Sequence, residues 1–492
     1  MIRNLTIRNP SFINSIAILP DLIPLSNWTS VLIGENGAKK SFILRALCEA
    51  AFGSRSFKPG RKGSTVGISV DKTDSFSRVI AISGTPLDRF PRLGTTNIGN
   101  RKTKSKRANY IYLGQRAENG MAGVSQSEKG LVGALISNRN RIKQNKEILT
   151  EVFAQLGLRP YIAIRLKLAS KDHDIVSLLA SKSITPLRNI FVDRLSTLSS
   201  EVESSHSFGV LRASDVRQFA QRLTNLHELK RVRTLLAEMT EGVVMLRFTV
   251  QSVVAKAMTL AVADWEALIR LGVVEIEGTS FMPLEASSGL RPRIDGEHLS
   301  SGQWSWLGNF VGLAVEVRDN SLILVDEPEN SLHPAWQRKF VSTLEKIVDR
   351  SENCQIVIAT HSPLIASGVS PRSGNVRSLV KSESVNGIQT IESVEKTVTY
   401  GWSTDDVYDE NFGVRNTRAT EFVERTNLAL SYIARDSFPS LKTLDKLIFD
   451  LQLDSIGLPP LDPMRVIVED ALSGLVRARS KNKISNVENR KQ

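Results

Sequence analysis

The chain has 492 residues, of which 41% are hydrophobic and 23% charged, and its formal net charge is +13. Its length suits two domains, and its composition speaks against a disordered chain. The two cysteines, Cys48 and Cys354, lack paired or metal-like spacing, no apolar run approaches the roughly 20 residues of a membrane helix, and the N-terminus alternates like a strand rather than a signal peptide. We therefore expect a cytoplasmic protein without a membrane segment.

Residues 1–116 contain several short runs of strand-forming residues, separated by glycine, proline and basic loops. The clearest runs are TSVLIG, STVGISV, RVIAISG and NYIYLGQ. After the first run, SFILRALCEAAFG carries apolar residues at helical spacing, which predicts a helix that ends near Gly53. We expect this part to be the first half of an α/β domain.

The rest of the chain divides into three further parts. Residues 117–285 have helical periodicity without a sustained heptad, which predicts a compact helical insertion. In residues 286–370 the runs NSLILVDEPE and CQIVIATHSP are nearly all apolar and β-branched, as in a parallel sheet covered on both faces. Residues 371–492 are polar, mostly helical and end in a basic tail. The predicted fold class is α/β with a mostly parallel sheet, plus a helical insertion and a helical C-terminal region.

The segment GENGAKKS, residues 34–41, nearly matches the phosphate-binding pattern G-x-x-x-x-G-K-[ST]. In that pattern backbone N–H groups and the lysine hold phosphates, and the hydroxyl binds Mg²⁺. Gly34, Asn36, Gly37, Lys40 and Ser41 are candidate ATP-binding residues, but Lys39 stands where the second glycine belongs. Because a Cβ there crowds the approach of backbone to phosphate, we expect weak ATP binding or slow hydrolysis. Taken alone, the motif also suits an ordinary glycine-rich turn.

Three further polar residues follow buried strands. Asp326 and Glu327 end LILVDE, where the first carboxylate can hold Mg²⁺ through water and the second can orient the attacking water. His361 follows IVIAT and lies 35 positions after Asp326, which fits an intervening helix and strand. Each residue alone also suits a purely structural role, and only their combination favours phosphate chemistry.

The run LSSGQ, residues 299–303, precedes a helix-like segment. Ser301, Gly302 and Gln303 at a helix N-terminus predict a second anion site, separate from the first. Trp304 and Trp306 follow directly, and we expect them in the core rather than on a partner surface.

The order of phosphate loop, LSSGQ, four apolar residues with Asp-Glu, SLHP and histidine resembles the ABC-type ATPase superfamily, with its SMC-like, RecF-like and OLD-like branches. The resemblance implies that two heads pair head to tail, each Mg²⁺–ATP lying between the loop of one copy and LSSGQ of the other. It implies Glu327 and His361 as catalytic residues and Ser41 and Asp326 as metal ligands. It also implies a glutamine that contacts Mg²⁺, for which Gln115 in YIYLGQR is the candidate.

Within this superfamily, ISGTPLDRFP, NYIYLGQRAENG and VTYGWSTDDVYDENFG are similar to the PtuA ATPases of Septu and retron-linked antiphage defence modules. That likeness implies a homo-oligomer working with a separate HNH nuclease, PtuB, and in retrons with a reverse transcriptase and its RNA–DNA hybrid. The net charge favours a nucleic-acid partner.

Two alternatives remain open. An OLD-like ATPase would cut DNA itself, but after His361 no strand ends in the acidic pattern of its nuclease domain. An SMC-like or RecF-like DNA-repair ATPase would fit the motifs, although the insertion is short and no long coiled coil is predicted.

Overall fold

The computed structural model describes residues 1–9, 12–20, 26–59, 64–72, 75–91, 109–114, 124–169, 177, 179, 183–202, 218–219, 221–223, 225–239, 244–249, 253–255, 262–285, 293–383 and 389–488. The chain forms two compact units, Met1–Phe412 and Gly413–Gln492. Gln115 and the basic run 101–107 lie outside the described residues.

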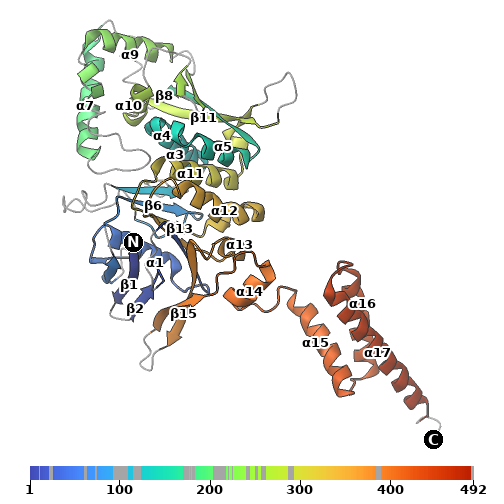
Figure 1. Cartoon of the computed structure of the whole chain (residues 1–492). Helices are drawn as coiled ribbons and strands as arrows, with labels where there is room; N and C mark the ends of the chain where they lie inside the picture. Colours follow the sequence, from blue (N-terminus) through green and yellow to red (C-terminus); the bar gives the residue numbers. More distant parts are fainter. Residues whose placement is uncertain are drawn as a thin grey trace. The chain divides into compact units, whose positions relative to one another are not determined.

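A seven-stranded sheet forms the centre of the first unit, in the order β16-β15-β3-β14-β13-β6-β7 (Figure 1). Its strands are β3 (Trp28–Ile33), β6 (Arg78–Ser83), β7 (Tyr110–Gly114), β13 (Ser321–Asp326), β14 (Gln355–Ala359), β15 (Gly374–Glu383) and β16 (Gln389–Lys396). All neighbouring pairs are parallel except β15 and β16. The prediction of an α/β fold with a mostly parallel sheet is confirmed.

The strands of this sheet other than β16 contribute side chains to two separate cores, because successive side chains point to opposite faces. In β6, Val79 and Ala81 join a core with α1 (Lys40–Ala51), while Ile80 and Ile82 join a core with α11 (Ser301–Glu316) and α12 (Pro334–Val348). Burial on both faces explains why the strands β3, β6, β13 and β14 are mainly apolar.

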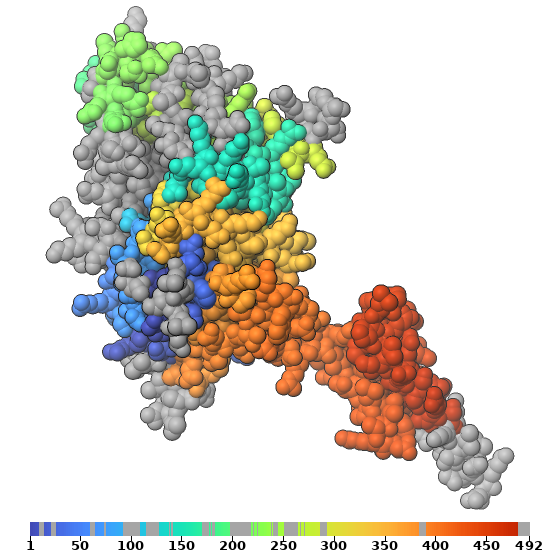
Figure 2. Space-filling model, in the orientation of Figure 1, coloured from blue at the N-terminus to red at the C-terminus, as the bar shows by residue number. Residues whose placement is uncertain are grey.

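A four-stranded antiparallel sheet, in the order β2-β1-β5-β4, contributes to the core that contains α1. Its strands are β1 (Ile2–Asn9), β2 (Phe12–Ala17), β4 (Ser56–Phe57) and β5 (Val66–Lys72). Figure 2 shows blue N-terminal residues directly beside gold and orange residues from beyond position 290. Strands that precede and follow the insertion in the sequence therefore belong to one compact unit.

The insertion is not purely helical, and that expectation is wrong. It supplies four strands of a five-stranded sheet in the order β10-β9-β8-β11-β12, whose strand β12 follows the insertion. Its strands are β8 (Leu158–Leu168), β9 (Val244–Thr249), β10 (Val253–Ala255), β11 (Val274–Pro283) and β12 (Ile294–Asp295). The described helices are α3 (Val124–Ser137), α4 (Arg139–Gln144), α5 (Lys146–Ala154), α7 (Thr185–Val202), α9 (Leu226–Glu238) and α10 (Val262–Arg270). The strands pair antiparallel over long sequence distances, which local helical periodicity does not reveal.

The region after residue 370 was expected to be mostly helical, and the structure adds the strands β15 and β16 before its helices. β15 pairs with β3, so it belongs to the central seven-stranded sheet. Helices follow: α14 (Thr404–Phe412) in the first unit, and α15 (Thr420–Arg435), α16 (Leu441–Ile456) and α17 (Pro463–Glu488) in the second. The second unit has its own core, to which α16 contributes Leu444, Leu447, Ile448 and Leu451 at helical spacing.

Among the described residues, no helix combines the length and apolar character needed to cross a bilayer.

Candidate nucleotide-binding site

The loop 34–39 leads from the end of β3 to the start of α1. Lys39 is the N-cap residue of α1, and its backbone is left-handed, with φ 59° and ψ 29°. No side chain caps this helix, and its first turn has no acidic residue. An uncapped N-terminus presents backbone N–H groups and a positive dipole end, which suit an anionic ligand.

Lys40 is buried beneath this loop. Its Nζ donates to the carbonyl oxygens of Gly34 at 2.9 Å and Glu35 at 3.4 Å. Burial lowers the pKa of Lys40 to about 8, against the opposing pull of nearby carboxylates, chiefly that of Glu327. The hydrogen bonds hold the ammonium group in the loop, and the nearby carboxylates only partly offset the cost of burying its charge. An anion that enters the loop therefore stabilises the charged form of Lys40.

Ser41 and Asp326 meet although 285 positions separate them in the chain. The Ser41 hydroxyl donates to Asp326 Oδ1 at 3.0 Å. Burial raises the pKa of Asp326 to about 7, the Ser41 hydrogen bond opposes this, and neighbouring carboxylates reinforce it. A hydroxyl and a carboxylate at a phosphate loop are the hard oxygen ligands that Mg²⁺ prefers, with the remaining positions left to water and phosphate. Among the described residues no cluster of three or more His, Cys, Asp or Glu side chains forms an all-protein metal cage.

Glu327 follows Asp326 in a strained backbone conformation, with φ 45° and ψ 56°. Its amide donates to the carbonyl of Ala359 at 2.9 Å, and its carboxylate accepts from Asn330 Nδ2 at 2.8 Å. A non-glycine residue in the left-handed region costs about 1–2 kcal/mol, and such strain gathers at functional sites. The backbone is therefore held so that the Glu327 carboxylate lines the cavity described below.

His361 is held by a residue that the sequence analysis missed. The backbone N–H of His361 donates to Glu329 Oε1, and the Thr360 hydroxyl donates to Glu329 Oε2 at 2.8 Å. Glu329 is in the short 3₁₀ helix Pro328–Ser331, and burial raises the pKa of its carboxyl group. The second glutamate of DEPE was the available signal, but its partner lies 32 positions away. Burial, and next the charge of Lys40, lower the pKa of His361, so its imidazole is neutral near pH 7.

A cavity of about 450 Å³ brings these groups together. It is lined by Asn36, Gly37, Ala38, Lys39, Lys40, Ser41, Phe42, Pro59, Val66, Arg89, Glu327 and His361. Cationic side chains and the α1 N-terminus form one part of the lining, and Phe42, Pro59 and Val66 supply apolar surface. This volume and this mixture suit a ligand with an anionic and an apolar end. Arg89 is a cationic lining residue that sequence reasoning missed.

The LSSGQ segment forms the N-terminus of α11, as predicted. The N-cap residue is Ser300, whose Oγ accepts from the Gln303 amide at 3.2 Å, while Gln303 Oε1 accepts from the Ser300 amide at 2.8 Å. Ser301 is the exposed first residue of the helix, and Gly302 is buried. None of Ser301, Gly302 and Gln303 is among the described residues that line the cavity. The Gln303 side chain is thus engaged in the cap, and the two anion-type sites are separate in one copy.

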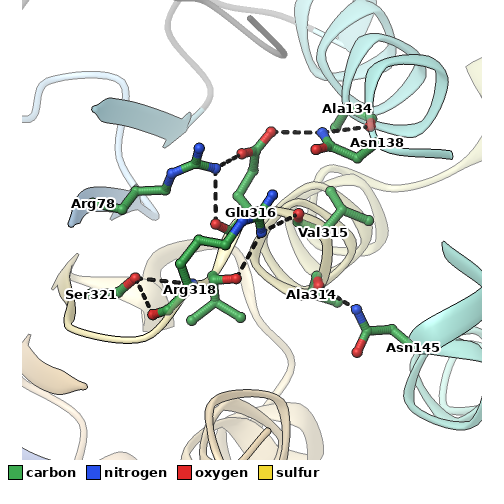
Figure 3. Close-up of polar contacts among 10 residues, drawn as sticks. Arg78, Ala134, Asn138, Asn145, Ala314, Val315, Glu316, Arg318 and Ser321 are labelled. Carbon is green, nitrogen blue, oxygen red and sulfur yellow. Dashed lines mark hydrogen bonds and ion pairs between the residues drawn. The ribbon is translucent and has the colours of Figure 1, made fainter. Parts of the chain in front are cut away.

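The other end of α11 is fixed by side chains from β6, from the two residues that flank α4 and from the segment after α11 (Figure 3). The Glu316 carboxylate accepts from Arg78 of β6 and from Asn138 Nδ2 at 2.8 Å. The last carbonyls of the helix are also satisfied: Asn145 donates to Ala314 at 2.7 Å, and Arg318 donates to Val315 at 2.9 Å. These contacts join α11 to the sheet and to the insertion.

Trp304 and Trp306 lie in the core, as expected, with exposures of 1% and 0%. Trp306 Nε1 donates to the carbonyl of Val152 in α5 at 3.3 Å, and Trp304 Nε1 donates to that of Gly296 at 2.9 Å. These aromatic side chains therefore extend the attachment of α11 to the insertion and its flanking segment.

Residues 289–367 match the protein family described as "AAA domain, putative AbiEii toxin, Type IV TA system". The matched segment is similar to AAA-family ATPase domains and includes LSSGQ, Asp326, Glu327 and His361. Protein ea59 of Escherichia phage lambda is 30% identical over 179 residues, which are 36% of this chain and 31% of that protein. The alignment thus spans about a third of the curated relative's length.

Among solved structures, the SMC head domain from Thermotoga maritima aligns with a TM-score of 0.28 and 13% identity, covering 80% of this chain and 99% of that one. The Smc head domain from Pyrococcus furiosus, with an extended coiled coil and bound to the C-terminal domain of ScpA, aligns with a TM-score of 0.29 and 11% identity. It covers 80% of this chain and 96% of that one.

Proposed function

We propose that this protein binds and hydrolyses ATP with Mg²⁺ at the loop 34–41. The observation that carries the proposal is the 3.0 Å hydrogen bond between Ser41 and Asp326. It joins the hydroxyl of a phosphate loop to the carboxylate at the end of a buried strand, which is the arrangement that a P-loop NTPase uses for its metal. Lys40, Glu327 and His361 belong to the same cavity lining.

Each side chain has a distinct role in this proposal. Lys40 and the first-turn N–H groups of α1 bind the phosphates, and Lys39 adds positive charge. Ser41 and Asp326 hold Mg²⁺, which when bound neutralises charge on the phosphate oxygens. Glu327 orients and deprotonates the attacking water, and the neutral imidazole of His361 donates a hydrogen bond to the terminal phosphate. Gln115 is a proposed further ligand, from outside the described residues.

The first prediction concerns Glu327. Glu327→Gln keeps the size and the hydrogen bonding of the side chain but removes the base, so ATP hydrolysis should fall by at least about 100-fold while ATP binding persists. Phosphate release and equilibrium binding of a fluorescent ATP analogue measure the two effects. Glu352→Gln, at an exposed position, is the matched control. Hydrolysis at the wild-type rate in Glu327→Gln contradicts the assignment of the base.

We further propose that two copies pair head to tail around two nucleotides. The support is the separation of the two anion-type sites, since Ser301 and Gly302 do not line the cavity of their own copy. A ligand bound between two copies uses both sites at once. ATP should therefore convert Glu327→Gln from a smaller to a larger assembly in sedimentation velocity experiments. Ser301→Glu should prevent this, because a carboxylate at the helix N-terminus repels phosphate.

At the level of biology, we propose a cytoplasmic subunit of an antiphage defence complex of Septu or retron type, in which a separate HNH nuclease cuts. Support comes from the likeness of three sequence segments to PtuA ATPases and from the net charge of +13, which suits a nucleic-acid partner. The matched family is described as including a putative toxin, and the curated relative is a phage protein. Both fit a role in conflict between phage and host.

The alternative is an OLD-like nuclease or an SMC-like or RecF-like repair ATPase, which shares the same ATP chemistry. Isolation of the native complex distinguishes these proposals. A copurifying HNH nuclease, with reverse transcriptase and RNA–DNA hybrid in a retron, supports the defence complex. DNA cleavage by the purified chain alone, abolished by metal chelation, supports the OLD-like alternative.

A further inference from the structure

Strand β15 extends beyond the end of β3 and over the phosphate loop. The last paired residues are Ser378 and Ile33, after which β3 ends and β15 continues beside β16. At Gly34 a Cβ atom would lie 2.8 Å from the carbonyl oxygen of Leu379, so the first glycine of the loop is needed for this close packing. Strand β15, from the C-terminal half of the chain, therefore packs against the loop 34–39 near the N-terminus.

Lys381, two residues further along β15, reaches the same loop. Its Nζ donates to the carbonyl oxygen of Asn36 at 3.2 Å, and lies 3.1 Å from the position that a Cβ of Gly37 would occupy. Asn36 and Gly37 both line the cavity. A lysine ammonium carries three donors, so one bond to Asn36 leaves two that can be directed at a ligand.

Two lysines, Lys40 of α1 and Lys381 of β15, therefore donate hydrogen bonds to the backbone of the loop 34–39. Lys40 donates to the carbonyls of Gly34 and Glu35, and Lys381 donates to that of Asn36. Lys39 is the N-cap residue of α1 at the end of the same loop and adds a third cationic side chain. Three like charges around one loop repel one another, and a polyanion in the loop relieves that repulsion.

We propose that Lys381 is a phosphate-binding residue that makes the site favour nucleoside triphosphates over diphosphates. This inference rests on the proposed nucleotide site at the loop 34–41. The cation lies next to Asn36 and Gly37, and its attraction increases with the charge of the bound phosphate chain. The terminal phosphate, which adds the charge that distinguishes the two ligands, gains most from it.

The experiment measures ATP and ADP dissociation constants for Lys381→Met, which keeps the aliphatic length and removes the charge. ATP affinity should fall about tenfold, as expected for one charge-assisted hydrogen bond, and ADP affinity by only about threefold. Lys381→Arg should retain most of the preference for ATP. The matched control is Lys396→Met on β16, where the lysine also donates to a backbone carbonyl, that of Glu410 at 3.1 Å.

The outcomes separate this inference from the function on which it rests. If the wild-type protein binds neither nucleotide, the proposed ATP site fails and the inference with it. If the wild type binds ATP and Lys381→Met has the same ATP-to-ADP preference, the inference alone is overturned. Equal losses for both nucleotides, together with a lower unfolding temperature without ligand, also overturn it, because they assign Lys381 to loop structure.

Discussion

At the scale of single residues, the position of Lys39 favours glycine for two reasons, its backbone conformation and the space that a phosphate needs. Its φ of 59° is in the left-handed region, where a side chain costs about 1–2 kcal/mol. Glycine at this position relieves that strain, but it also increases the entropy of the unfolded chain by about 0.5–1 kcal/mol. The two terms partly cancel, so the expected effect of this residue on the free energy of unfolding is about 1 kcal/mol or less.

The prediction for Lys39→Gly is thus a change in the site rather than in stability. ATP affinity or turnover should rise a few-fold because the backbone approaches phosphate more closely, while the unfolding free energy changes by less than about 1 kcal/mol. Isothermal titration calorimetry and chemical denaturation measure the two quantities. Asn353→Gly, at another left-handed position with φ 55°, is the control for strain relief outside the loop. Unchanged affinity and turnover in Lys39→Gly would refute the idea that this lysine impairs the site.

The pKa values of Asp326 and Lys40 predict a narrow pH optimum. Below about pH 7 Asp326 becomes protonated and loses its affinity for Mg²⁺, and above about pH 8 Lys40 loses its charge. The kcat/KM for ATP should therefore be bell-shaped, with a maximum between these values and about a tenfold decline one unit beyond either limit. A pH profile of steady-state hydrolysis tests this, and a flat profile from pH 6 to 9 contradicts it.

In the absence of metal, the raised pKa of Asp326 also makes the free energy of unfolding depend on pH. Its folded-state pKa of about 7 exceeds the ordinary value of 3.8, so the folded protein binds the extra proton between these values. The contribution of Asp326 to the free energy of unfolding is therefore complete below pH 3.8, and it is lost as the pH rises through about 7. Mg²⁺ should therefore stabilise the protein more at pH 8 than at pH 6.

At the scale of elements, α11 links the LSSGQ site to the insertion. Glu316, only 3% exposed, lies at the C-terminus of this helix, where a negative charge is unfavourable in the helix dipole. Arg78 and Asn138 compensate it (Figure 3). The cost of removing one member of such a buried pair is large, because the other charge stays buried without its partner.

Glu316→Ala should accordingly destabilise the first unit by about 3 kcal/mol in urea denaturation. The matched control is Glu147→Ala, which breaks the exposed ion pair between Glu147 and Arg350 at 3.0 Å and should cost less than about 1 kcal/mol. Replacing both Arg78 and Glu316 with apolar residues should recover part of the loss. Equal effects of the Glu316 and Glu147 variants would show that the pair is not a structural anchor.

At the scale of the whole molecule, the sequence correctly predicted those strands and helices that a local pattern of apolar residues marks. The apolar strands β3, β6, β13 and β14 and the helix α1 were expected, because burial on both faces leaves a continuous apolar run in a strand and helical packing leaves apolar residues at helical spacing. The meeting of Ser41 with Asp326 required the resemblance to a known superfamily, since no local signal joins residues 285 positions apart.

Other parts were missed for the same physical reason. Strands β8 and β11 pair across more than 100 positions, and their partly exposed residues give no clean alternation. β15 and β16 contain many polar residues because they form one edge of the sheet. The contact of Lys381 with the loop 34–41 depends on the pairing of β15 with β3, and the sequence alone did not predict that pairing.

The strand order has a consequence for how the chain folds. β3 lies between β15 and β14, so this N-terminal strand obtains both of its neighbours from residues beyond 350. During synthesis β3 therefore has no partner in this sheet until residues beyond 350 have been made. Such non-local pairing makes folding slow, and the phosphate loop reaches its final shape only after β15 has joined the sheet. A nascent chain is thus unable to complete the loop 34–41 until residue 381 has been made, which delays any ATP-driven assembly until that point.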